Sequence, residues 1–156
     1  MALAESYGIT EYPAPAGGCL LTDPIFSLRL KELLSHNPSP DMREVELLKT
    51  GRHFRLGPET KIVIGRNKKE NEFIEKWILP EDSIARVIGF PGPMAVAVGK
   101  IRGDEDWERL AQLCLTYSDA PGGQEVAVQV GQGQRKRVIR IMKVEKEVFR
   151  EMMISQ

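Results

Sequence analysis

The sequence predicts an α+β domain in which strands paired as hairpins form an antiparallel or mixed sheet with helices packed on it. Short apolar or alternating runs occur in pairs that are joined by turn sequences, which is typical of hairpins. Helical patterns separate these pairs, whereas regular βαβ winding would alternate single strands with helices. A chain of 156 residues with 42% hydrophobic residues is large enough to bury one core.

Residues 1–22 are expected to form an extended arm or linker, and residues 23–156 the folded domain. Gly and Pro recur along this segment, and its apolar residues show neither helical nor strand periodicity. The two cysteines, Cys19 and Cys114, stand far apart and neither belongs to a CxxC pair, which favours a reducing compartment. The sequence contains neither a signal-peptide pattern nor an apolar run of about 18 residues. We therefore expect a cytoplasmic protein that does not enter a membrane.

Two helices are predicted at the start of the domain. Asp23 before Pro24 has the form of an N-cap and a first helical residue, and apolar residues then recur at helical spacing to about Ser35. Asp41 and Glu44 have the spacing of a capping box, which predicts a second, short helix.

A hairpin and a third helix follow. Residues 52–56 alternate between polar and apolar, residues 61–65 form a β-branched run, and the sequence GPET between them is a turn. Asn67, with Glu70 three residues later, predicts a helix start, and the apolar face of this helix runs through Ile78.

The second half of the chain repeats this organisation. Residues 83–90 and 94–101 flank the turn PGP, and the second run is apolar enough for a central strand buried on both faces. Asp104 is expected to cap a helix with an apolar stripe that includes Cys114, which we interpret as a buried core thiol. Two further strands joined by GQGQ and a C-terminal amphipathic helix over 145–154 complete the predicted elements.

The most informative segment is the first hairpin with the helix start that follows it. Lys+Arg and Asp+Glu both number 22, so any nucleic-acid site must be a local patch. Cations at a helix start oppose the macrodipole, but together with free N–H groups they suit a phosphate. Asn side chains there could bind sugar or base edges. The candidate RNA and phosphate contacts are Arg52, His53, Arg55, Arg66, Asn67, Lys68, Lys69 and Asn71. The alternative is a solvated face paired with Glu59, Glu70 and Glu72.

A second basic stretch lies on the last predicted strand and comprises Arg135, Lys136, Arg137, Arg140 and Lys143. It either extends the patch or guards an edge strand against pairing with another chain, and the sequence does not decide between these interpretations.

Catalysis by this chain alone has little support. The sequence has two histidines and contains no Gly-x-Ser-x-Gly elbow, no GKS/T phosphate loop and no HExxH motif. Cys19 and His53 would be the nucleophile and base of an autonomous enzyme, but their spacing is not diagnostic. Catalytic residues stay unassigned, and no metal or cofactor is expected to bind this chain.

Residues 12–101 resemble the C-terminal part of bacterial proteins related to tRNA thiouridylases, which often carry the label tRNA (5-methylaminomethyl-2-thiouridylate)-methyltransferase. AGGCLLTDP and GRHFR are the specific strings. The segment also resembles the NFACT-type RNA-binding domain, in which a GRN sequence with a downstream Asn precedes a helix, as Gly65 to Asn67 and Asn71 do here.

The resemblance implies a tRNA-binding part of a transferase that modifies tRNA by thiolation. Its partners would be tRNA and an N-terminal ATP pyrophosphatase domain of the same protein, which uses ATP through an SGGxDS loop that is absent from this sequence. Some relatives hold an iron–sulfur cluster, for which Cys19 would be a candidate ligand in the parent protein. The alternative function is a protein-interaction module that contacts a sulfur carrier or a ribosome.

Overall fold

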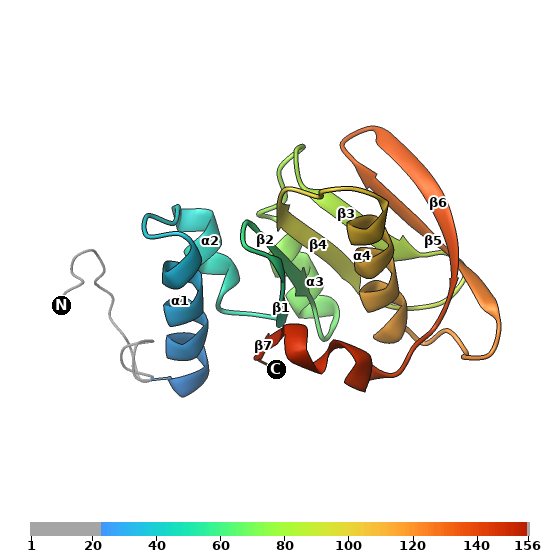
Figure 1. Ribbon diagram of the computed structural model, residues 1–156, viewed down its shortest axis with the longest axis horizontal. Helices are drawn as coiled ribbons and strands as arrows, with labels where there is room; N and C mark the ends of the chain where they lie inside the picture. The colour runs from blue at the N-terminus through green and yellow to red at the C-terminus, as the bar shows by residue number, and fades with distance from the viewer. Residues whose placement is uncertain (1–22, 156) are drawn as a thin grey trace.

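The computed structural model describes residues 23–155, so the predicted arm and Cys19 lie outside the described part of the chain. Seven strands form one sheet in the order β6-β5-β3-β4-β2-β1-β7, and all neighbouring strands are antiparallel. Helices pack on both faces of this sheet (Figure 1). The fold is therefore α+β, as the sequence predicts. The helices are α1 (Pro24–His36), α2 (Met42–Leu47), α3 (Lys68–Glu75), α4 (Asp104–Thr116) and the 3-10 helix η2 (Lys146–Met152), and the strands are β1 (Arg52–Gly57), β2 (Thr60–Ile64), β3 (Ser83–Val87), β4 (Met94–Gly99), β5 (Glu125–Gln132), β6 (Arg135–Met142) and β7 (Met153–Ser155).

The three predicted hairpins are confirmed. β1 pairs with β2, β3 with β4 and β5 with β6. β4 occupies the centre of the sheet, and its first four residues are buried, as expected for a strand covered on both faces.

The caps predicted for the first three helices are also confirmed. The Asp23 carboxylate accepts hydrogen bonds from the backbone N–H groups of Ile25 and Phe26. Asp41 and Glu44 form the reciprocal bonds of a capping box. The Asn67 side chain accepts a 2.9 Å bond from the Glu70 N–H. Each cap satisfies a backbone donor that the first turn of a helix would otherwise leave free.

Two boundaries differ from the predictions. α3 ends at Glu75, and Trp77 and Ile78 reach the core from the turn that follows. Gly103, whose φ is 145°, is the N-cap of α4, so Asp104 is the first helical residue and does not cap it.

The prediction of an amphipathic helix over 145–154 is wrong. Residues 146–152 form a 3-10 helix, and residues 153–155 then become a strand that pairs with β1. Without β7, β1 would end the sheet with unpaired backbone groups, and satisfying them outweighs the helical pattern of the segment.

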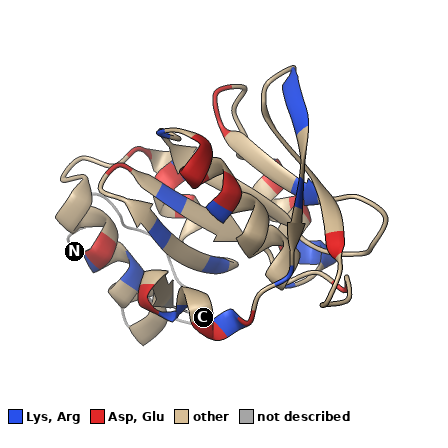
Figure 2. Ribbon diagram, turned by 45° about the vertical axis from the view of Figure 1, so that its right-hand side comes forward, with Lys and Arg blue, Asp and Glu red and all other residues tan. Residues whose placement is uncertain are grey.

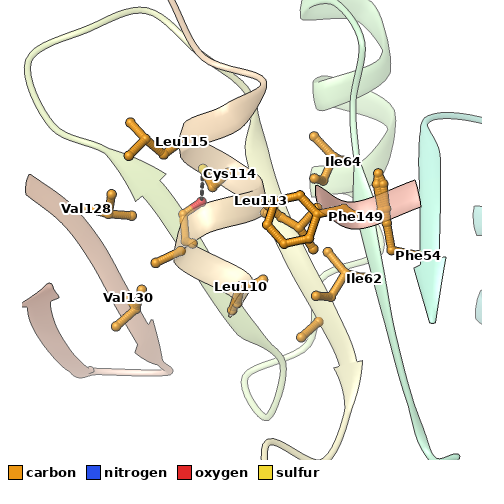
Figure 3. Packing of buried hydrophobic residues seen from close by; sticks show 14 of the residues in the cluster. Phe54, Ile62, Ile64, Leu110, Leu113, Cys114, Leu115, Val128, Val130 and Phe149 are labelled. Atoms are coloured by element: carbon orange, nitrogen blue, oxygen red, sulfur yellow. Dashed lines mark hydrogen bonds between the residues drawn. The ribbon is translucent and has the colours of Figure 1, made fainter. Parts of the chain in front are cut away.

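The main core fills the space between α4 and one face of the sheet, which we call the α4 face. Phe54, Ile62, Val128 and Phe149 point into it (Figure 3). Cys114 lies there as predicted, and its thiol is close to the carbonyl oxygens of Ala85 and Pro93, at 3.3 Å from each. Burial raises the pKa of this thiol to about 12.

The opposite face, which we call the α3 face, has a smaller core. Leu47 of α2 and Ile74 of α3 pack there against Val63, Met94 and Val96. α1 joins this layer through a separate cluster of Phe26, Leu33 and Leu48. Between residues 23 and 155, no helix combines the length and apolar character that crossing a bilayer requires.

Candidate nucleic-acid interface

The start of α3 is built on a close approach between Gly65 and Asn71. A Cβ on Gly65 would overlap the Oδ1 atom of Asn71, so the chain needs a glycine to turn from β2 into the helix here. The Oδ1 atom of Asn71 is thereby buried, with no hydrogen-bond partner in the described chain. Asn71 shapes the turn and presents little to a ligand, while Asn67 caps the helix with its own oxygen.

Three cations surround this helix start. Lys68 and Lys69 are exposed, and neither makes an ion pair with another residue of 23–155. Arg66 is exposed too, and its guanidinium binds the Glu70 carboxylate at 2.7 Å. The hydrogen bond to Glu70 raises the pKa of Arg66, and the same bond lowers the pKa of Glu70. Exposed pairs of this kind contribute only about 0–1 kcal/mol, so a phosphate could replace the carboxylate at low cost.

Arg52 lies near this group but faces the other side of the sheet. Its guanidinium stacks over the Tyr117 ring at 4.5 Å from the centroid, and the Lys146 ammonium lies 5.2 Å from the same centroid. Burial lowers the pKa of Arg52, and the nearby Arg66 lowers it further. Arg52 is thus held by an aromatic ring at the edge of the patch.

His53 and Arg55 do share one face of β1, as alternation predicts, but α1 and α2 cover that face. His53 is 0% exposed, and its Nε2 atom lies 2.8 Å from the Thr50 carbonyl. Burial lowers its pKa well below the usual range. Arg55 donates two 2.7 Å bonds to Glu32 of α1. The structure therefore separates both residues from the exposed cations at the α3 start.

The second basic stretch divides between the two faces of the sheet. Val130, which points into the main core, pairs with Arg137, so Arg137 lies on the α4 face, where it contacts Asp104 at 3.2 Å. Lys136 and Arg140 occupy the alternate positions and lie on the α3 face. All three are exposed, and Lys and Arg colour the tip of the β5–β6 hairpin in Figure 2. Arg135 takes the α4 side, like Arg137.

Lys143 belongs to the scaffold. Its ammonium donates to the carbonyl oxygens of Ser118 and Ala120, at 2.9 and 2.8 Å. It ties the end of β6 to the loop after α4 and is not available to a ligand.

A groove lies on the α3 face beside the cations of β6. It has a volume of about 340 Å³ and lies where the segment after α3 meets β3, β5 and β6. Arg86 and Lys136 line it beside Ile84 and Gln129. Arg86 was not among the residues predicted from the sequence, although its alternation with Ile84 along residues 83–87 indicates that the two side chains share a face.

These cations therefore lie on one face of the molecule. β2, which leads into α3, and β6 are separated by four strand spacings, or roughly 19 Å. The exposed cations along this path, which we call the α3-face band, are Lys68, Lys69, Arg86, Lys136 and Arg140. Acidic partners are few and weak, since Glu75 contacts Arg86 at 3.3 Å and Glu125 lies 4.0 Å from Arg140.

Comparisons with known proteins give a family and a likeness of fold. A family model described as the NFACT protein RNA binding domain matches residues 51–153, which begins just before β1 and leaves out α1 and α2. The solved structure of the C-terminal part of a fibronectin/fibrinogen-binding protein from Streptococcus suis is similar, with a TM-score of 0.56 at 12% identity, over 86% of this chain and 70% of that one. This likeness concerns the fold alone. A search of curated proteins finds no match.

Proposed function

The chain belongs to the family of NFACT protein RNA binding domains, and we propose that it docks RNA along the α3-face band. The observation that supports this surface is the placement of five exposed cations on one face, of which Arg86 and Lys136 line a groove. Lys68 and Lys69 bind phosphate at the α3 start, while Lys136 and Arg140 bind it on β6. The remaining face carries Arg135 and Arg137 and is largely covered by α4.

The helix start contributes through its backbone as well as its side chains. The first turn of α3 presents N–H groups and the positive end of the helix dipole, so a phosphate beside Lys68 and Lys69 gains from both. Arg66 joins them by exchanging Glu70 for a phosphate oxygen. Because the whole chain has a formal net charge of zero, attraction to RNA depends on this local concentration of cations.

We propose tRNA as the RNA, and this choice rests on the resemblance of residues 12–101 to tRNA-thiolating proteins. The matched family concerns RNA binding, so a thiolating parent with an ATP pyrophosphatase domain stays a prediction from the sequence. The alternative enzyme built on Cys19 needs an accessible base, whereas His53 is fully buried.

The test is a titration of the full chain with unmodified tRNA over a series of salt concentrations. Two double variants, Lys68→Ala with Lys69→Ala and Lys136→Ala with Arg140→Ala, each remove two cations from one end of the band. Arg109→Ala is the matched control, because Arg109 is an exposed arginine of α4 on the other face.

Each phosphate contact contributes about 0.7–0.9 to the slope of log K against log salt, so each double variant should lower that slope by roughly 1.4–1.8. Binding by the control should equal that of wild type. If both double variants bind tRNA with the same salt dependence as wild type, the α3-face band does not contact the RNA. Absence of tRNA binding at low salt would favour the protein-interaction function.

A further inference from the structure

Lys61 is a buried lysine without a hydrogen-bond partner. It lies on β2, opposite Arg55 of β1 and Val98 of β4, and only 6% of its surface is exposed. Its Nζ atom is almost inaccessible to solvent and donates no hydrogen bond to any residue from 23 to 155. An ammonium carries three donors, so this arrangement leaves all three unsatisfied.

The side chain lines a pocket of about 200 Å³ between the sheet and the first two helices. β1, β2 and β4 form its floor, and α1 and α2 form its walls through Leu33 and Leu47. His36, Pro58 and Glu59, which also line it, are exposed, so the pocket opens to solvent on their side.

The two carboxylates that act on Lys61 are already engaged, while Glu59 lies on the exposed side of the pocket. Glu32 accepts both bonds from Arg55. Glu44 accepts bonds from the Asn37 amide at 3.1 Å and from the Asp41 N–H at 3.2 Å. Lys61 therefore lies among charged groups without a direct oxygen partner, a costly state for a buried ammonium.

We propose that this pocket binds a small oxyanion, a phosphate or a carboxylate group, through Lys61. Its oxygens accept the hydrogen bonds that the ammonium now lacks, and Arg55 adds a second positive charge to the wall. The pocket volume accommodates such a group with accompanying water. None of the residues that line this pocket belongs to the α3-face band, so the site is separate from the RNA-docking proposal.

The chemistry fits either a free anion or the terminal phosphate of a nucleotide. Four probes separate these sources: inorganic phosphate, acetate, a dinucleotide with a 5′-phosphate and the same dinucleotide without it. Calorimetric titration of the full chain with each probe gives affinity and stoichiometry. Preference for the phosphorylated dinucleotide over inorganic phosphate identifies a nucleotide end, and the reverse identifies a free anion.

The decisive comparison uses Lys61→Met, which has a side chain of similar length without the charge, with Lys31→Met as the control, because Lys31 is an exposed lysine of α1 outside both the pocket and the α3-face band. We expect one phosphate or carboxylate per chain at this pocket, with at least about tenfold weaker binding in Lys61→Met, which corresponds to 1.4 kcal/mol. The Lys31→Met control should bind it as wild type does.

Lack of saturable binding by all probes, or equal binding by wild type and Lys61→Met, would overturn the proposal. If Lys61→Met does not fold, NMR of the wild type tests binding at Lys61 through the ammonium and Cε resonances of this residue. They should shift on addition of the probe, and unchanged resonances would count against the site.

Discussion

Lys61 should make the stability of the protein depend on pH in an unusual direction. Burial lowers its pKa from 10.5 to about 8 in the folded chain. The neighbouring charges partly cancel, since Arg55 and Arg29 lower this pKa while Glu32 and Glu44 raise it. Between pH 8 and 10.5 the unfolded chain holds a proton that the folded chain has released, so stability attributable to Lys61 rises with pH in that window.

The magnitude follows from the size of the shift. A difference of 10.5 − 8 = 2.5 pKa units, at 1.36 kcal/mol per unit, amounts to about 3 kcal/mol. Below pH 8 the ammonium is charged in both states and the full cost is present. Lys61→Met removes this cost. The free energy of unfolding of Lys61→Met minus that of wild type should therefore fall by about 3 kcal/mol between pH 7 and pH 10.5.

The assay is urea unfolding of wild type and Lys61→Met at several values of pH from 7 to 10.5, with Lys31→Met as an exposed control. Differences between variants are needed because burial raises the pKa of Cys114 to about 12 and also raises that of Tyr117, which weakens the fold as pH rises. These contributions are common to all three proteins and cancel. A stability difference between Lys61→Met and wild type that is constant with pH would refute the reasoning.

Four further perturbations test other parts of the structure. Arg66→Ala should weaken tRNA binding and lower its salt slope by about 0.7–0.9, because one phosphate contact is lost; an unchanged slope in the titration would leave Arg66 as a partner of Glu70 only. Asn67→Ala should cost about 1 kcal/mol in urea unfolding, since the cap of α3 is lost, whereas equal stability would mean that water replaces it. Gly65→Ala should destabilise the fold by more than the cap variant, because the new methyl overlaps Asn71, and thermal unfolding measures this loss. Deletion of 153–156 should speed amide hydrogen exchange along β1, and unchanged exchange in β1 would show that its pairing with β7 adds no protection.

The sequence predicted those features that depend on neighbouring residues along the chain. Asp23, Asp41 and Asn67 were identified as caps because the acceptor and its donors lie within three residues of each other. The hairpins followed from alternation and turn residues in the same way. β7 was missed because its strand conformation depends on β1, about one hundred residues earlier.

The same distinction between local and long-range contacts applies to the residues of the candidate site. Lys68 and Lys69 are exposed at the α3 start as expected, since their position follows from the local cap. His53 and Arg55 were grouped with them because alternation reveals which residues share a face but not which helix covers that face. Arg86 was overlooked, since a single arginine becomes informative only when β5 and β6 bring Lys136 and Arg140 beside it.

The pairing of β7 with β1 also bears on how this domain combines with others. Because the last strand lies directly beside the first, the two ends of the matched segment leave the sheet at the same edge (Figure 1). A segment whose ends meet can be inserted into a loop of a host protein, or joined end to end and reopened elsewhere, without rearranging its core. The matched segment therefore has the geometry of a unit that can be transferred between proteins.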